Sequence, residues 1–128
     1  MFLPVSLALC AYGDILKTVT CYRPLGEAEL KLVADSGYTI WPPRLPEQPI
    51  FYPVTNLEYA IRLTQWNVSD FGKGYVTKFE VESEYMEQFP VKCVGDKECL
   101  EWWVPAEELS ALNSKIVGKI EVVYETGT

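Results

Sequence analysis

The sequence contains no histidine, although it is 128 residues long. Without an imidazole, neither a Ser-His-Asp nor a Cys-His mechanism is available, and every metal site that requires histidine is excluded. The four cysteines form no CxxC pair, so the chain carries neither a zinc-ribbon nor a thioredoxin motif. The remaining candidates for chemistry are carboxylates, arginines and aromatic side chains, and we expect no metal site.

Positive charge is also scarce: 11 Lys and Arg face 18 Asp and Glu, which gives a formal net charge of −7. Nucleic-acid-binding proteins usually carry a basic stripe, because neutralising phosphates with Lys and Arg releases counterions. This sequence has none, so we do not expect DNA or RNA to be a general partner. It also contains no candidate membrane span. With four cysteines that we expect to be reduced, it is typical of a cytoplasmic protein.

Hydrophobic residues make up 48% of the chain and aromatic residues 13%, which is ample material for a packed core. The length fits one domain, since a chain of this size rarely closes two cores. The first dozen residues are apolar but lack the basic region of a signal peptide. We therefore predict an N-terminal extension over residues 1–18 and a single domain over residues 19–128.

Hydrophobic periodicity predicts an α+β fold with a mixed sheet, because strands alternate with helices early in the chain and meet through short turns later. Residues 41–49 contain four prolines, which favour a stiff, ordered loop. A turn is expected at residues 95–96. Strands are predicted at residues 19–22, 38–41, 50–53, 74–81, 91–94, 100–104 and 119–124, and helices at residues 27–35, 55–66, 83–89 and 105–112.

Three charged residues are candidates for a functional site. Glu101 opens an apolar strand beside two tryptophans, where a carboxylate is either functional or an ordinary strand-end charge. Arg23 follows the first strand, and its planar fork suits a phosphate, a carboxylate or a structural ion pair. Arg44 projects from the proline-rich loop, which either presents it to a ligand or is simply a rigid lid. Local sequence leaves each alternative open.

Phe51, Tyr52 and Tyr59 form an aromatic cluster at a strand-to-helix connection. Such rings can stack on a flat heterocycle, although packing in the core is their commoner fate. The cluster is therefore a candidate ligand platform or a part of the core.

Several unusual segments occur together in the order typical of one group of short bacterial proteins. The chain resembles the family labelled "ADP-ribosylation/crystallin J" in the segments 21–24, 43–53, 74–81, 103–109 and 116–122. The likeness covers roughly residues 19–124. It implies an ADP-ribosyltransferase-like fold, with a small, mainly antiparallel split sheet and flanking helices. The larger, all-helical ADP-ribosylglycohydrolases, which the label also covers, are not similar to this chain.

ADP-ribosyltransferases carry three dispersed elements around a crevice that holds NAD. The first is a strand-end Arg or His, and Tyr22-Arg23 is similar to it. The third is a catalytic Glu four residues before a proline, and the spacing from Glu101 to Pro105 matches it.

The second element is an aromatic or Ser/Thr strand that leads into a helix, and Phe51-Tyr52 followed by Tyr59 is similar to it. The register is open by one residue, so Phe51 and Tyr52 compete for the key position. The Ser-Thr-Ser form of this element is absent, and Pro53 interrupts the strand.

The resemblance implies a role for each element. Arg23 would bind a ribose or phosphate of NAD, the aromatic residues would flank the nicotinamide, and Glu101 would stabilise the oxocarbenium-like transition state. NAD would be the substrate, the acceptor an unknown protein or small molecule, and no metal would be needed. The alternative is a non-catalytic binding or immunity-type module that keeps the fold. Convergence of Arg23, Tyr52 and Glu101 on one crevice distinguishes the two hypotheses.

Overall fold

The computed structural model describes residues 17–71, 73–93 and 100–127. Most of the predicted N-terminal extension and the predicted turn at residues 95–96 lie outside the described residues. In chain order, the elements are β1 (Thr18–Leu25), α2 (Glu27–Asp35), β2 (Ile50–Phe51), α3 (Leu57–Phe71), β3 (Lys73–Glu82), α4 (Ser83–Met86), β4 (Val91–Cys93), β5 (Leu100–Trp102), β6 (Val104–Pro105), a 3-10 turn (Ala106–Glu108), α5 (Leu109–Ser114) and β7 (Ile116–Gly127).

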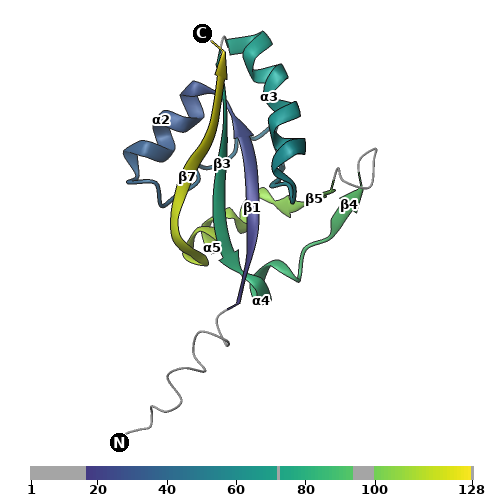
Figure 1. The fold of residues 1–128 in the computed structure, drawn as a ribbon. Helices are drawn as coiled ribbons and strands as arrows, with labels where there is room; N and C mark the ends of the chain where they lie inside the picture. Colours follow the sequence, from purple (N-terminus) through teal and green to yellow (C-terminus); the bar gives the residue numbers. More distant parts are fainter. Residues whose placement is uncertain (1–16, 72, 94–99, 128) are drawn as a thin grey trace, which may run out of the picture.

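The central strand of the largest sheet is β3, which pairs with β1 on one side and β7 on the other (Figure 1). Both pairings are antiparallel, and Cys21 lies opposite Phe79 in the first of them. The strong alternation of residues 74–81 predicted this strand, and the structure confirms it. Strand β7 is bulged at two places where its register with β3 shifts. The predicted α+β class with mainly antiparallel pairing is confirmed.

A second group of short strands extends from the other edge of β1. Strand β2 pairs with β6 and β4 pairs with β5, both antiparallel. Val54 connects them to the main sheet, because it pairs with Tyr22 of β1 and with Glu101 of β5. Directly opposed residues in antiparallel strands project to the same face. Tyr22, Val54 and Glu101 therefore form one row with a common orientation.

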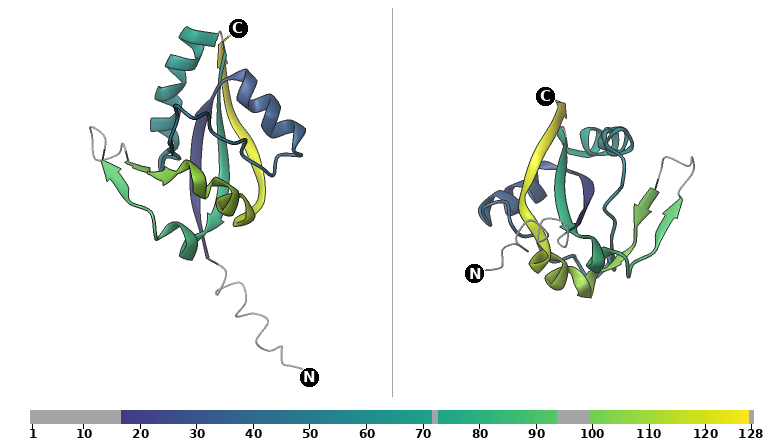
Figure 2. Two further views of the ribbon diagram at one scale, coloured as in Figure 1. Left: turned by 180° about the vertical axis from the view of Figure 1, so that it is seen from behind. Right: turned by 60° about the horizontal axis from the view of Figure 1, so that its bottom comes forward.

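The main sheet separates two hydrophobic cores, with α2 on one side and α3 on the other (Figure 2). Alternation along β1 sends Cys21 into the first core and Tyr22 against the second. The buried residues of the major core are Cys21, Leu25, Val33, Trp41, Phe51, Tyr75, Phe79, Val81, Met86, Phe89, Trp102, Val104, Leu109, Leu112 and Ile120. Those of the minor core are Val54, Tyr59, Ala60 and Val76.

Helix α2 confirms the sequence prediction at both ends. It begins after Gly26 and ends at Asp35, and Gly37 follows with a φ of 80°, a conformation that glycine adopts without a steric cost. The expected strand at residues 38–41 is wrong. Tyr38 has a φ of 63°, and its carbonyl accepts a hydrogen bond from the Ile120 backbone N–H. This positive φ bends the segment away from a strand.

Helix α3 begins two residues later and ends five residues later than the predicted range of 55–66. Asn56 caps its first turn, because the Asn56 Oδ1 atom accepts a 2.9 Å hydrogen bond from the Tyr59 N–H. The helix continues to Phe71, so its predicted end at residue 66 is wrong.

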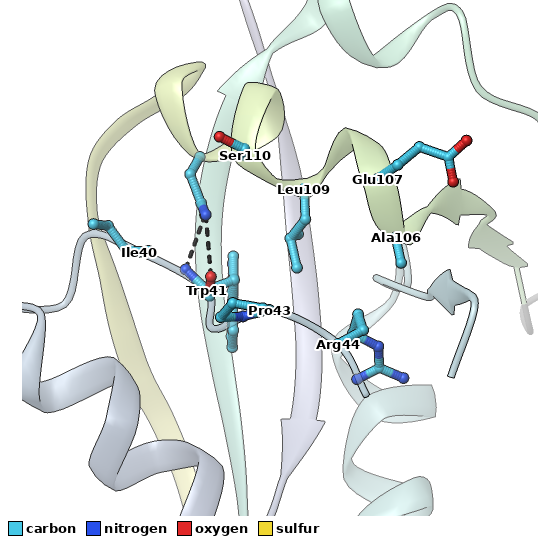
Figure 3. A pocket seen from close by; sticks show the side chains of 9 residues that line it. Ile40, Trp41, Pro43, Arg44, Ala106, Glu107, Leu109 and Ser110 are labelled. Atoms are coloured by element: carbon cyan, nitrogen blue, oxygen red, sulfur yellow. Dashed lines mark hydrogen bonds between the residues drawn. The ribbon is translucent and has the colours of Figure 1, made fainter. Parts of the chain in front are cut away.

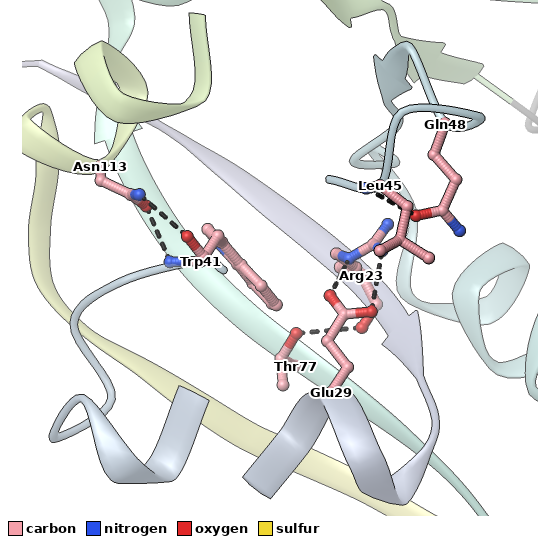
Figure 4. A network of polar contacts seen from close by, with 7 residues as sticks. All are labelled: Arg23, Glu29, Trp41, Leu45, Gln48, Thr77 and Asn113. Carbon is pink, nitrogen blue, oxygen red and sulfur yellow. Dashed lines mark hydrogen bonds and ion pairs between the residues drawn. The ribbon is translucent and has the colours of Figure 1, made fainter. Parts of the chain in front are cut away.

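The proline-rich loop packs on the sheet through Trp41. The Trp41 side chain is 1% exposed and lies edge-on to Phe79 of β3, with 5.1 Å between the ring centroids. Asn113 of α5 holds the Trp41 backbone: its Oδ1 accepts from the N–H at 2.8 Å and its Nδ2 donates to the carbonyl at 3.1 Å (Figure 4). These contacts fix the residues that lead to Arg44.

Candidate functional site

Arg23 leaves β1 on the side of the major core and is almost fully covered, with an exposed fraction of 9%. Its guanidinium makes a two-pronged ion pair with Glu29, through Nε at 2.8 Å and Nη2 at 3.0 Å (Figure 4). The guanidinium also lies 4.7 Å from the Phe51 ring centroid and 5.7 Å from that of Trp41. Glu29 therefore already occupies a pair of Arg23 donors in the bidentate arrangement with which an arginine binds an anion best.

Glu29 reaches Arg23 because β1 ends at Leu25 and α2 begins at Glu27, with only Gly26 between them, which places the first helical turn beside the end of the strand. Sequence reasoning did not assign this residue. The signal was present, since an acidic residue in the first turn of a helix is favoured by the helix dipole and here follows a strand-end arginine by six positions. The contact between Trp41 and Arg23 was likewise not predicted.

Arg44 is the least satisfied charged group of this region. Its guanidinium lies 6.0 Å from the Phe51 ring centroid, so Arg23 and Arg44 contact the same ring. The Nε atom of Arg44 is buried, and no described residue accepts a hydrogen bond from it. Burial lowers the pKa of Arg44 below its usual value, and the nearby positive charge of Arg23 lowers it further. An arginine is nevertheless charged at any physiological pH.

A surface hollow of about 470 Å³ adjoins Arg44, between the proline-rich loop and helix α5 (Figure 3). This volume is within the range of small-molecule sites. The hollow combines apolar walls with a few polar groups, which is the composition expected of a ligand site. Its lining residues are Ile40, Trp41, Pro43, Arg44, Ala106, Glu107, Leu109, Ser110 and Asn113.

Glu101 lies in a different environment, where two donors orient its carboxylate. The Tyr59 hydroxyl donates to Oε2 at 3.3 Å, and the Trp103 indole N–H donates to Oε1 at 3.1 Å. Tyr52 packs edge-on against Trp103, with 5.5 Å between ring centroids, and the Lys92 ammonium lies 4.3 Å from the Trp103 ring centroid. Trp103 was not assigned in advance, although its position two residues after Glu101 along an extended segment places both on one face.

The structure divides the predicted site residues between two faces instead of gathering them in one crevice. Arg23 packs on Phe51 in the major core, whereas Glu101 bonds to Tyr59 in the minor core. The row through Tyr22 and Val54 gives the reason, because Glu101 shares the orientation of Tyr22, and Arg23, the next residue along β1, points the opposite way. The expected convergence of Arg23 with Glu101 therefore does not occur.

The structure also shows where Phe51 and Tyr52 lie, which the sequence left open. Phe51 is buried at 1% exposure and supports the two arginines, while Tyr52 is 36% exposed and lies beside Trp103. Tyr22 packs against the minor core and is part of neither arginine contact. Phe51 and Tyr52 thus do not compete for one place, because each belongs to a separate site.

Comparisons with protein-family models, with curated proteins and with solved structures found no match. Among the residues that the structure describes, no group of three or more Cys, Asp or Glu side chains is arranged to hold a metal ion. Within residues 17–71, 73–93 and 100–127, no helix is both long and apolar enough to cross a membrane. Function must therefore be inferred from the two groups of side chains, one around Arg44 and one around Glu101.

Proposed function

We propose that this protein is a binding module for a small molecule that carries an anionic group, and that Arg44 receives this group. The observation that supports the proposal is the buried Arg44 Nε without a described acceptor, at the edge of the 470 Å³ hollow. Chains normally satisfy such donors, because an unpaired buried polar atom costs about 1–3 kcal/mol. A ligand oxygen in the hollow could supply the missing hydrogen bond once the Arg44 side chain turns its Nε–H toward the ligand.

The surroundings of Arg44 favour an anion over a neutral acceptor. The guanidinium groups of Arg23 and Arg44 lie on the same ring, and the carboxylate of Glu29 neutralises only one of the two positive charges. Glu107 also lines the hollow, but it is exposed and solvent screens its charge. A bound carboxylate or phosphate oxygen would offset the remaining positive charge and form a charge-assisted hydrogen bond. The apolar walls beside Arg44 would receive the rest of the ligand, which we infer to be a flat or apolar group.

NAD is the first ligand to test, because it joins a pyrophosphate to two flat heterocycles. Isothermal calorimetry with millimolar NAD should give a saturable signal for the wild type and a much weaker one for Arg44→Gln. Lys31→Gln is the matched control, since it also removes one positive charge, from a side chain that is 77% exposed, pairs with Asp35 on the surface of α2 and does not line the hollow. Equal affinities for both variants and the wild type would refute the role of Arg44.

An ADP-ribosyltransferase is the second candidate, and one observation favours it: Glu101 is held by two donors beside the exposed ring of Tyr52. In this alternative NAD would bind on the Glu101 face and donate ADP-ribose to an unidentified protein or small molecule. Nicotinamide release from NAD tests it. Glu101→Gln should then lose roughly 10²–10³ in rate, as expected for one preorganised electrostatic group. Binding of NAD without nicotinamide release would leave the binding module and eliminate the transferase.

A further inference from the structure

We propose that Glu29 determines the charge of the ligand that the Arg44 site accepts, restricting it to a singly charged anionic group. This inference rests on the proposed function, because it assigns a specificity-determining residue to the same site. The site would then distinguish a carboxylate or a phosphodiester, each with one negative charge, from a phosphomonoester, which carries close to two negative charges at neutral pH.

The charges of three side chains decide which ligand the site accepts. Two guanidinium groups lie on the ring of Phe51, and one carboxylate, that of Glu29, is bonded to the first of them. These three side chains sum to one positive charge; Glu107 also lines the hollow, but it is exposed and solvent screens its charge. A singly charged ligand brings this sum to zero, whereas a doubly charged ligand leaves one uncompensated negative charge in a partly buried site, which is unfavourable.

The two arginines differ in how accessible their donors are to a ligand. Glu29 occupies the Nε and Nη2 donors of Arg23, and the Arg23 residue is 9% exposed, so a ligand has little access to this guanidinium. Arg44 offers the unoccupied donor. The ligand anion would therefore bond to Arg44 while it experiences the field of both Arg23 and Glu29. The lowered pKa of Arg44 responds to both of these neighbours, which places them within electrostatic range of its guanidinium.

Glu29 is more than an ordinary helix-dipole residue. The first turn of α2 holds two acidic residues, Glu27 and Glu29, and both are placed equally well for the dipole. Only Glu29 is bonded to Arg23, with a side-chain exposure of 25%. Glu27 is exposed, so it provides an internal control that differs in position but not in charge or helix.

Two aromatic phosphates that differ by one charge provide the test. Phenyl phosphate is doubly charged at pH 8, and its methyl ester, phenyl methyl phosphate, is singly charged with the same ring. Calorimetry would measure both dissociation constants for the wild type, Glu29→Gln and Glu27→Gln. The Gln side chain keeps an acceptor for Arg23, and circular dichroism would verify the fold of each variant.

We expect Glu29→Gln to bind the methyl ester roughly tenfold and phenyl phosphate roughly a hundredfold more tightly than the wild type, since removing a nearby charge acts once per ligand charge. The preference for the doubly charged probe should thus rise about tenfold. Glu27→Gln should change both constants by about twofold or less, because its charge is solvated. Equal shifts in the two variants would overturn the role of Glu29.

The wild type alone provides a second test that needs no variant. It should bind phenyl phosphate no more than about threefold more tightly than the methyl ester, because repulsion by Glu29 and the cost of desolvating the second charge together offset the attraction of the arginines. A tenfold or larger preference of the wild type for phenyl phosphate would contradict the proposal. Failure of the wild type to bind either probe would instead contradict the anion site itself, so the two failures are distinguishable.

Discussion

Replacing Asn113 by alanine should release the proline-rich loop from helix α5. The Asn113 amide makes two hydrogen bonds to the Trp41 backbone, at 2.8 Å and 3.1 Å, and the Trp41 side chain is 1% exposed. A buried backbone group that loses its partner costs about 1–3 kcal/mol, and two groups are affected here. Water can reach a half-buried site in part, so we expect the free energy of unfolding to fall by about 2–3 kcal/mol.

Urea denaturation, followed by tryptophan fluorescence and by circular dichroism, would measure this change. Ser110→Ala is the control, because Ser110 is exposed, lines the same hollow and lies on the same helix. We expect the control to change stability by less than about 0.5 kcal/mol. If Asn113→Ala lies within that range of the control, the two hydrogen bonds do not hold the loop. Asn113→Ala should also weaken anion binding, since the loop positions Arg44.

Three further predictions concern buried groups. Thr77→Val should lower the free energy of unfolding by about 1 kcal/mol in urea titrations, because the buried Thr77 hydroxyl donates to the Arg23 carbonyl at 3.0 Å; an unchanged midpoint would contradict this. Burial and hydrogen bonding to Glu108 raise the pKa of Tyr85 to about 12, so the folded state holds this proton more tightly than the unfolded chain. Stability should fall as the pH rises from about 10, the pKa of an unperturbed tyrosine, to about 12, and urea midpoints of Tyr85→Phe should lack this component of the loss. Cys21 is fully buried and burial raises its thiol pKa, so peptide mass spectrometry should find it alkylated by iodoacetamide only after unfolding; rapid labelling of the native protein would refute this burial.

Local signals predicted the elements that local physics determines. The alternation over residues 74–81 identified the central strand, and Gly37 marked the end of α2, since a positive φ at this position favours glycine. The expected strand at residues 38–41 failed for a tertiary reason. The carbonyl of Tyr38 bonds to Ile120, which is distant in sequence, and nothing in the residues themselves indicates this contact.

The candidate site was predicted residue by residue but not in its arrangement. Arg23, Phe51 and Glu101 each make specific side-chain contacts, yet the face of the sheet to which each points depends on the pairing of Val54 with β1 and β5. Because strand side chains alternate, a shift of one residue in that pairing would reverse the outcome. The sequence alone does not specify which residues of neighbouring strands are paired. The separation of Arg23 from Glu101 could therefore only come from the structure.

The Nε–H resonance of Arg44 provides the most direct test of the central claim. Two-dimensional proton–nitrogen spectra would follow this signal, assigned by its loss in Arg44→Gln, during a titration with phenyl methyl phosphate. Because the Nε of Arg44 lacks a described acceptor, its proton should move downfield and become protected from exchange as the anion binds. The Arg23 Nε–H, already bonded to Glu29 at 2.8 Å, should move far less. An Arg44 signal that stays in place at saturating ligand would contradict the anion site.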